Sequence, residues 1–243
     1  MTILPAAILF DLDETIISFG SRRQILQEVV EEFGEIFAPL APAEAANALE
    51  AGFRRFWADE ERAAIWRQNL SEGRILAVEE SFQPLRDRAS ALTSAFARTF
   101  GERFHAYREE QGKFFPGALE TIRFFREREV KLALVTNGAA EPQRAKVERF
   151  ALAPLFHHVQ IEGEAGFGKP QERAYLHAMQ ALGVEARETW MVGDNLEWEV
   201  AAPQRLGIYG IWHDHLGEGV PEGSPVKPDR IVRSIAELVS GFD

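Results

Sequence analysis

The 243-residue sequence contains no cysteine, so it has no disulfide bond, thiol nucleophile or thiolate metal site. Disulfides are rare in the reducing cytoplasm, and their absence here favours a cytoplasmic protein. The sequence also lacks any uncharged apolar stretch near the roughly 20 residues that a membrane-spanning helix needs. The apolar residues 3–10 have no basic leader and end at Asp11, so we expect no signal peptide.

Positive charge is scarce in this chain. The 27 Lys and Arg residues are outnumbered by 38 Asp and Glu residues, which gives a formal net charge of −11 at pH 7. Nucleic acid and anionic membranes are bound through clustered Lys and Arg, so we expect neither as a partner. A small anionic substrate would need local positive charge, which a metal ion and one well-placed lysine could supply.

Apolar periodicity divides the chain into three stretches. Residues 1–10 have the pattern of a buried strand, and residues 21–111 follow a helical period without an intervening strand. Breaks at 34, 39–42, 71–73 and 84 predict four or five helices in that stretch.

From residue 115 onward, short β-prone runs alternate with helical patterns. The predicted strands are 131–136, 157–161, 188–192 and 208–212, and the predicted helices are 117–129, 141–150, 171–182 and 196–206. Pro203 should kink the last helix or mark its first turn. Strands that alternate with helices predict an α/β fold with a parallel sheet.

The helical stretch separates the first strand from the later ones. A structureless loop of about a hundred residues would be improbable, so we expect residues 18–113 to form a helical domain. The core would consist of residues 1–17 and 114–243. Active sites of open parallel sheets lie at the carboxyl ends of the strands, where this insertion begins, so it is placed to be a lid.

Two carboxylates, Asp11 and Asp13, follow the first predicted strand. Residues at this spacing lie on one side of an extended segment and can converge on a single site. Because two close carboxylates repel each other, a bound divalent cation would keep both ionised. Mg2+ prefers one or two carboxylates plus phosphate oxygens. The pair therefore indicates Mg2+, and an exposed turn is the alternative.

Polar groups also follow the later predicted strands. A Thr-Asn-Gly triplet at 136–138 offers donors that suit a phosphate, although Asn-Gly is equally a turn signal. Lys169 could neutralise a phosphoryl oxygen or be a surface lysine. Asp194 places another carboxylate at a strand end and suggests the third corner of a metal site.

The order of these groups resembles the four motifs of the haloacid dehalogenase superfamily. The motifs are Asp11-x-Asp13-x-Thr15, Thr136-Asn137-Gly138, Lys169-Pro170 and Gly193-Asp194-Asn195. The helical insertion after the first motif is similar to that family's C1 cap, and the resemblance covers nearly the whole chain. It implies a Rossmann-like parallel-sheet core with an inserted all-helical cap domain, Mg2+ dependence and an aspartyl-phosphate intermediate.

The resemblance also implies site roles. Asp11 would be the nucleophile and Asp13 the general acid and base. The metal would be held by Asp11, the backbone carbonyl of Asp13, and Asp194. The ligands of the substrate phosphate would be Thr136, Asn137, Gly138 and Lys169.

The last motif departs from the family pattern. It usually ends in an aspartate five residues after its first, where this chain has Glu199. One extra methylene leaves a direct or water-mediated metal contact open. Asn195 would orient Lys169 or a metal-bound water.

These features predict a Mg2+-dependent phosphomonoester hydrolase for a small phosphorylated metabolite. The alternatives of the same fold are a 2-haloacid dehalogenase, a phosphomutase and a non-catalytic binding protein. Halide displacement needs neither an acid nor a metal, so Asp13 favours phosphate. The pattern is similar to phosphatases of sugar phosphates, phosphoglycolate, nucleoside monophosphates and acylneuraminate 9-phosphate, and it selects none of them. The oligomeric state stays open.

Other features carry weaker signals. Residues 163–169 match the start of a phosphate-binding loop of ATPases, but Pro170 lacks the hydroxyl that would hold Mg2+. The histidine pairs at 157–158 and at 213 and 215 have no matching metal-ligand spacing. Arg22 and Arg23 are candidates for binding a second anionic group, although a solvated helix start explains them equally well.

Overall fold

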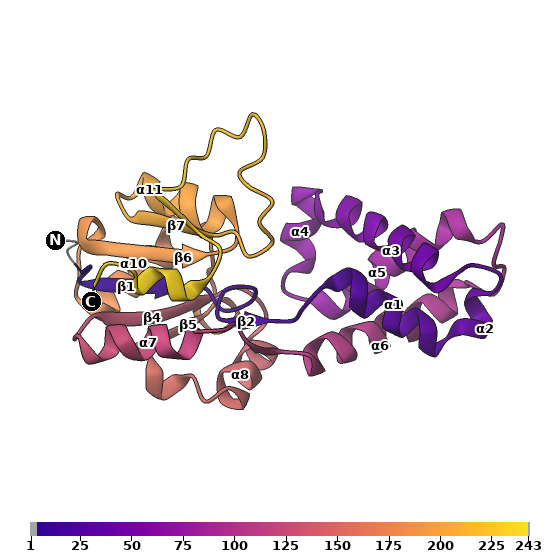
Figure 1. Ribbon diagram of the computed structural model, residues 1–243, viewed down its shortest axis with the longest axis horizontal. Helices are drawn as coiled ribbons and strands as arrows, with labels where there is room; N and C mark the ends of the chain where they lie inside the picture. The colour runs from indigo at the N-terminus through magenta and orange to yellow at the C-terminus, as the bar shows by residue number, and fades with distance from the viewer. Residues whose placement is uncertain (1–3, 243) are drawn as a thin grey trace. The chain divides into compact units, whose positions relative to one another are not determined.

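The computed structural model describes residues 4–242, apart from the side chains of residues 60 and 64. The chain divides into two compact units, Met1–Ser18 with Lys113–Asp243, and Phe19–Gly112. We call them the sheet unit and the helical unit (Figure 1). Each has a buried core of its own, and each is described separately below.

The sheet unit is built around six strands in the order β5-β4-β1-β6-β7-β8, and all neighbouring pairs are parallel. The strands are β1 (Ala7–Phe10), β4 (Lys131–Thr136), β5 (His158–Ile161), β6 (Thr189–Gly193), β7 (Tyr209–His213) and β8 (Arg230–Val232). All four residues of β1 are buried, because it is a central strand covered on both faces.

Helices cover both faces of this sheet (Figure 1). Leu9 and Met191 share one face with Tyr175 of α10 (Glu172–Leu182), whereas Trp190 points to the other and meets Phe125 of α7 (Ala118–Glu127) at 6.2 Å between ring centroids. The helical elements of the unit are α7 (Ala118–Glu127), α8 (Ala140–Arg149), η2 (Ala153–Leu155), α9 (Glu162–Ala165), α10 (Glu172–Leu182), η3 (Ala186–Glu188), η4 (Leu196–Ala201), α11 (Ala202–Arg205) and η5 (Ile235–Val239). The predicted α/β fold with a parallel sheet is confirmed.

A short two-stranded antiparallel sheet lies where the chain leaves and re-enters the sheet unit. It pairs β2 (Ile17–Ser18) with β3 (Lys113–Phe114). Neither this two-stranded sheet nor β8 was predicted, because two or three residues are too few to show a strand period.

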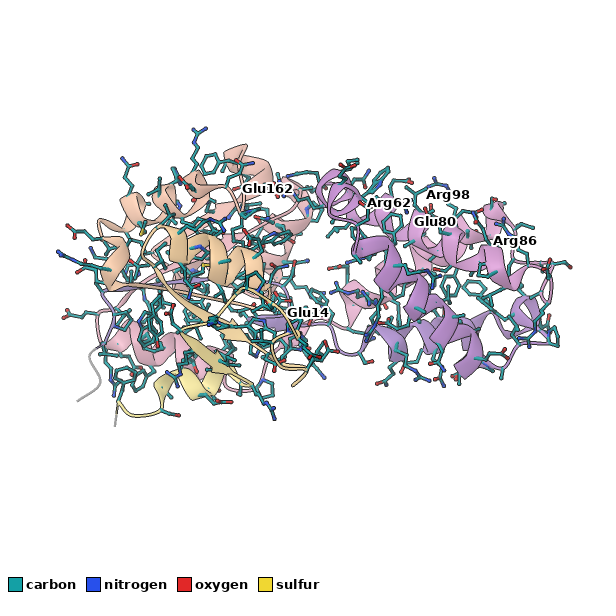
Figure 2. All side chains as sticks on the ribbon, turned by 90° about the horizontal axis from the view of Figure 1, so that it is seen from above. Glu14, Arg62, Glu80, Arg86, Arg98 and Glu162 are labelled. Atoms are coloured by element: carbon teal, nitrogen blue, oxygen red, sulfur yellow. The ribbon has the colours of Figure 1, made fainter. Side chains whose placement is uncertain are left out.

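The helical unit, residues 19–112, contains only helices and the turns and loops that join them, in the backbone that the structure describes. The helices are α1 (Arg22–Glu32), α2 (Gly34–Phe37), α3 (Pro42–Trp57), α4 (Glu60–Trp66), α5 (Leu70–Phe82), η1 (Gln83–Leu85) and α6 (Ser94–Glu110). Aromatic rings fill the core, and Phe82 stacks on Phe96 at 5.8 Å between centroids. The surface carries ion pairs such as Arg62–Glu80, which contribute little to stability because they are exposed (Figure 2).

The predicted helix break at 71–73 is wrong. These residues lie inside α5, whose start is capped by the side chain of Asn69. Gly73 does not end the helix. A Cβ atom there would come within 2.9 Å of Trp57 and 2.8 Å of Trp66, so glycine permits close packing instead.

The predicted helix 196–206 is divided in the structure. η4 is a π-helical turn, and Pro203 lies in the first turn of α11. This confirms the second of the two positions expected for Pro203. None of the helices in residues 4–242 is both long and apolar enough to span a membrane.

Candidate active site

The carboxyl ends of the central strands bring the predicted polar groups to one edge of the sheet. Phe10 of β1 pairs with Leu134 of β4 on one side and with Val192 of β6 on the other. The residues that follow these pairs therefore share an edge, which is where Asp11 begins its loop. Thr136 ends β4 at this edge, and Asp194 follows β6.

Lys169 reaches this edge from the loop between α9 and α10. Its Nζ atom lies 2.5 Å from Oδ1 of Asp11 and 2.7 Å from Oε1 of Glu199, and its side chain is only 1% exposed. A second hydrogen bond holds Asp11, because the Thr15 hydroxyl donates to Oδ2 at 3.2 Å. Buried lysines are rare unless they are paired, and here two carboxylates provide the pairing.

The charges of this group shift one another's pKa. Burial alone would lower the pKa of Lys169, but Asp11 and Glu199 outweigh it and raise that pKa above its usual value. Burial raises the pKa of Glu199 to about 7, against the opposing effect of Lys169. Burial also raises the pKa of Asp11, although Lys169 lowers it. Lys169 therefore remains a cation at neutral pH.

Asp194 adds a further acid to the same edge. Its pKa is raised well above the usual value, first by burial and then by the charges of Asp11, Glu199 and Glu14. Asp11 and Glu199 thus contact the single buried lysine, and Asp194 lies close enough to both carboxyl groups to interact with their charges. A divalent cation would offset this surplus of negative charge, so the donor chemistry suits Mg2+.

No group of three or more His, Asp or Glu side chains within residues 4–242 is arranged to hold a metal ion. The predicted ligand set is smaller than such a group, because it combines the Asp11 and Asp194 side chains with the backbone carbonyl of Asp13. The metal roles of these residues therefore stay predictions.

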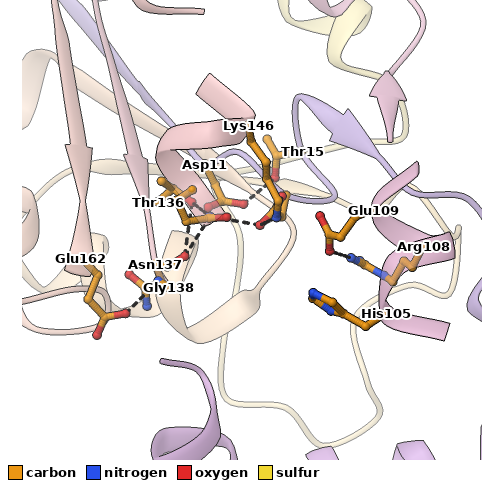
Figure 3. A network of polar contacts seen from close by, with 12 residues as sticks. Asp11, Thr15, His105, Arg108, Glu109, Thr136, Asn137, Gly138, Lys146 and Glu162 are labelled. Carbon is orange, nitrogen blue, oxygen red and sulfur yellow. Dashed lines mark hydrogen bonds and ion pairs between the residues drawn. The ribbon is translucent and has the colours of Figure 1, made fainter. Parts of the chain in front are cut away.

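Asn137 and Gly138 direct their donors toward the protein. The Asn137 side chain donates to the Lys169 carbonyl at 2.6 Å and accepts from the Lys169 N–H at 2.8 Å. The Gly138 N–H donates to Oε2 of Glu162 at 3.0 Å (Figure 3). Their phosphate-binding roles remain predictions, whereas the structure shows that Asn137 fixes the backbone of Lys169. Glu162, which is buried, was not anticipated from the sequence.

Asp13 is held by two side chains of α8. The Nζ atom of Lys146 lies 2.9 Å from both carboxylate oxygens, and Nε2 of Gln143 lies 3.1 Å from one of them. Sequence reasoning missed both residues. A signal existed, because α8 has very few apolar residues, so a helix that packs here has to bury polar ones. Gln143, Lys146 and Val147 are its buried residues.

Asn195 and Glu199 organise the loop after β6. Oδ1 of Asn195 accepts the N–H groups of Glu197 and Trp198, both at 3.0 Å, and so caps the π-helical turn. The Asn195 N–H donates to Glu199 at 2.8 Å. Asn195 therefore reaches Lys169 only through Glu199. A Cβ atom on Gly193 would lie 2.0 Å from Cγ of Glu199, so glycine is required beneath this carboxylate.

The histidines do not form a site with these groups. His213 is buried, and its Nδ1 contacts the backbone carbonyl of Glu14 at 3.1 Å. Burial, and then the nearby His215, lowers the pKa of His213 to about 4. A neutral His213 therefore supports the loop that carries Asp13.

Comparison with known proteins gives matches over most of the chain. The family model of the haloacid dehalogenase-like hydrolases matches residues 5–207. A phosphoserine phosphatase of Thermus thermophilus is 34% identical over 200 residues, which cover 78% of this chain and 73% of that protein. The pyrimidine 5′-nucleotidase YjjG of Escherichia coli is 27% identical over 232 residues, with 95% of each chain covered.

Solved structures share the fold. The HAD-hydrolase YfnB of Bacillus subtilis superposes with a TM-score of 0.73 at 21% identity, covering 98% of both chains. A 2-haloacid dehalogenase of Pseudomonas syringae gives a TM-score of 0.56 at 21% identity, covering 97% of this chain and 96% of that one. The fold alone therefore does not separate phosphate chemistry from halide chemistry.

Proposed function

The chain belongs to the haloacid dehalogenase-like hydrolase family, and we propose that it is a Mg2+-dependent phosphomonoester hydrolase. Its substrate is a small phosphorylated metabolite, which is cleaved through an aspartyl-phosphate intermediate. The observation that carries the proposal is the pairing of the buried Lys169 cation with Asp11, two residues before a second acid, Asp13. The similarity to proteins named phosphatase and nucleotidase supports it.

Asp11 is the nucleophile in this proposal. Its carboxylate attacks the phosphorus atom in line with the leaving oxygen, and the bond to that oxygen breaks. Lys169, 2.5 Å from Asp11, favours the ionised form of this carboxyl group against the effect of burial and offsets charge on the transferring phosphoryl oxygens. Asp13 acts in its protonated form: it gives its proton to the leaving alkoxide, and the proton that it later takes from the water that cleaves the acyl phosphate restores that form.

Mg2+ would be held by Asp11, Asp194 and the backbone carbonyl of Asp13. When bound, it supplies positive charge that neutralises the phosphate and lets carboxylates and phosphate approach one another. The surplus of acidic groups around Lys169 supports this assignment. The helical unit would serve as the cap domain.

A dehalogenase is the competing reaction on this fold. It displaces a halide, which leaves without a proton, so it has no use for an acid at position 13. Here Asp13 is contacted by Lys146 and Gln143, which gives the acid a defined place. That feature favours phosphate over halide.

The test is release of inorganic phosphate from a panel of phosphomonoesters, with Mg2+ and with EDTA. The panel includes O-phosphoserine, pyrimidine nucleoside monophosphates and glyceraldehyde 3-phosphate. We expect release by the wild type with Mg2+ and none by Asp11→Asn, while Asp87→Asn, which alters an exposed aspartate of the helical unit, keeps full activity. Chloride release from 2-chloropropionate without phosphate release from any ester would overturn the proposal.

A further inference from the structure

The α8 helix places two polar side chains, Gln143 and Lys146, one turn apart on its buried face. Lys146 is 10% exposed at the side chain, and its Nζ atom is 2.9 Å from each oxygen of Asp13. Neither residue belongs to the four motifs. Figure 3 shows Lys146 beside Asp11, Thr15 and Thr136.

Stability alone does not explain this pair. The pair is only partly buried, since the Asp13 side chain is 28% exposed, and even a fully buried ion pair can often be replaced by apolar side chains without loss of stability. The neighbouring Val147 shows that this face of α8 also accepts an apolar residue. The ion pair therefore points to a role in fixing the Asp13 carboxylate.

Gln143 links Asp13 to the end of β4. Its Nε2 atom lies 2.5 Å from Oγ1 of Thr136, 2.9 Å from the carbonyl of Asn137 and 3.1 Å from Oδ2 of Asp13. An amide nitrogen has two N–H donors for these three acceptors. The contact with Asp13 is the longest and is therefore the one that can be exchanged while Gln143 keeps its hold on β4.

A general acid or base has to lie within about 2.6–3.2 Å of the atom that it serves. The Asp13 side chain turns about two bonds, so the contacts that its oxygens make decide where they point. Lys146 contacts both oxygens from a helix of the scaffold, and this limits that rotation. Lys146 is thus able to determine whether Asp13 faces the leaving oxygen.

We propose that Lys146, assisted by Gln143, is the positioning residue for Asp13 in proton transfer to the leaving group. This inference rests on the proposed phosphohydrolase function. It predicts that loss of Lys146 harms the steps in which Asp13 transfers a proton and spares the attack by Asp11. The effect should therefore depend on the leaving group.

Single-turnover assays with enzyme in excess separate the two cases. They measure leaving-group release before water cleaves the intermediate. p-Nitrophenyl phosphate releases a stable phenolate that needs little protonation, whereas O-phosphoserine releases an alkoxide that does. We expect Lys146→Met to slow serine release by about 10- to 100-fold, a part of the 10²- to 10⁴-fold that proton-transfer catalysis supplies. Release of p-nitrophenolate should change by no more than about threefold, since it draws little on that catalysis.

Arg144→Met is the matched control. Arg144 lies on the same helix and is paired with Glu164 at 2.5 Å, away from Asp13, so its loss should leave both rates unchanged. Lys146→Arg keeps the charge and should restore part of the rate on O-phosphoserine. Gln143→Leu should show the same dependence on the leaving group, and circular dichroism checks that each variant is folded.

Three results would overturn the inference. Equal slowing of both esters by Lys146→Met and Lys146→Arg would show that Lys146 supports the whole site rather than Asp13. Unchanged rates on both esters would show that the ion pair has no part in proton transfer. A folded wild type that releases phosphate from no ester of the panel would overturn the proposed function, whereas an active wild type that gives either of the first two results would overturn this inference alone.

Discussion

Removing the buried cation at the active site should destabilise the protein in a way that depends on pH. Lys169→Met deletes the only lysine among the groups that the structure places against Asp11 and Glu199, at 2.5 and 2.7 Å. Breaking a buried pair by removing one partner costs about 3–5 kcal/mol, because the remaining charge is left uncompensated. A typical total stability is about 5–15 kcal/mol, so the loss is a large share of it.

The pH dependence follows from the carboxyl groups that remain. With Lys169 present, the pKa of Glu199 is already about 7, and Lys169 lowers it. Without the lysine, Glu199 and Asp11 hold protons more tightly in the folded state than in the unfolded one. A raised folded pKa gives stability that is present at low pH and is lost as the pH rises through it. The cost of the substitution should therefore grow from pH 5 to pH 8, by about 1.4 kcal/mol per unit for each additional proton held.

Urea unfolding followed by tryptophan fluorescence and circular dichroism measures the cost. Thermal unfolding gives a second measure. At about 2–4 °C per kcal/mol for a chain of this size, the melting temperature at pH 8 should fall by about 6–20 °C. Lys131→Met is the control, because the exposed Lys131 donates to the Leu182 carbonyl, and its loss should show little dependence on pH. A cost for Lys169→Met below about 1 kcal/mol, or the same cost at pH 5 and pH 8, would refute the reasoning.

Two further predictions concern other parts of the chain. Phe100→Ala should cost about 3–5 kcal/mol and lower the urea midpoint of the helical signal, because Phe100 is fully buried among phenylalanine rings; a cost below about 1 kcal/mol would contradict it. Burial lowers the folded pKa of His213 to about 4, below its unfolded value. The protein should therefore lose about 3 kcal/mol of stability as the pH falls from 6.5 to 4. His213→Gln should flatten this acid limb in urea titrations at pH 4.5 and 7, and an unchanged slope would exclude His213 as its source.

The sequence predicted the sheet well because its strands are continuous buried runs that end in polar residues. β4 matches the predicted range 131–136, β5 begins one residue later than predicted, and β6 is shifted by one residue at both ends. The antiparallel pair of β2 and β3 could not be found in this way. Its two-residue strands show no period, and its pairing joins residues about a hundred positions apart, so only tertiary contacts reveal it.

Buried polar residues on a helix are the main part of the site that sequence reasoning missed. Polar positions on a helix are normally assigned to the solvent face, so the scarcity of apolar residues in α8 was the one sign that Gln143 and Lys146 could face inward. They are buried because Asp13 lies opposite them, 133 residues before Lys146 in the chain. Glu199 was found only by resemblance. Its approach to Lys169 depends on the π-helical turn of η4. Such turns are rare in proteins, but those that occur are often found at functional sites.

Each of the two proposed catalytic carboxylates is held by an element other than its own strand. Asn137, at the end of β4, binds the backbone of Lys169, and Lys169 in turn contacts Asp11. The backbone carbonyl of Asn137 accepts from Gln143, which also contacts Asp13. Asn137 therefore supports both proposed catalytic carboxylates, Asp11 through Lys169 and Asp13 through Gln143. Asn137→Asp would leave the Lys169 carbonyl without its donor, so it should disturb the position of Asp11 more than that of Asp13.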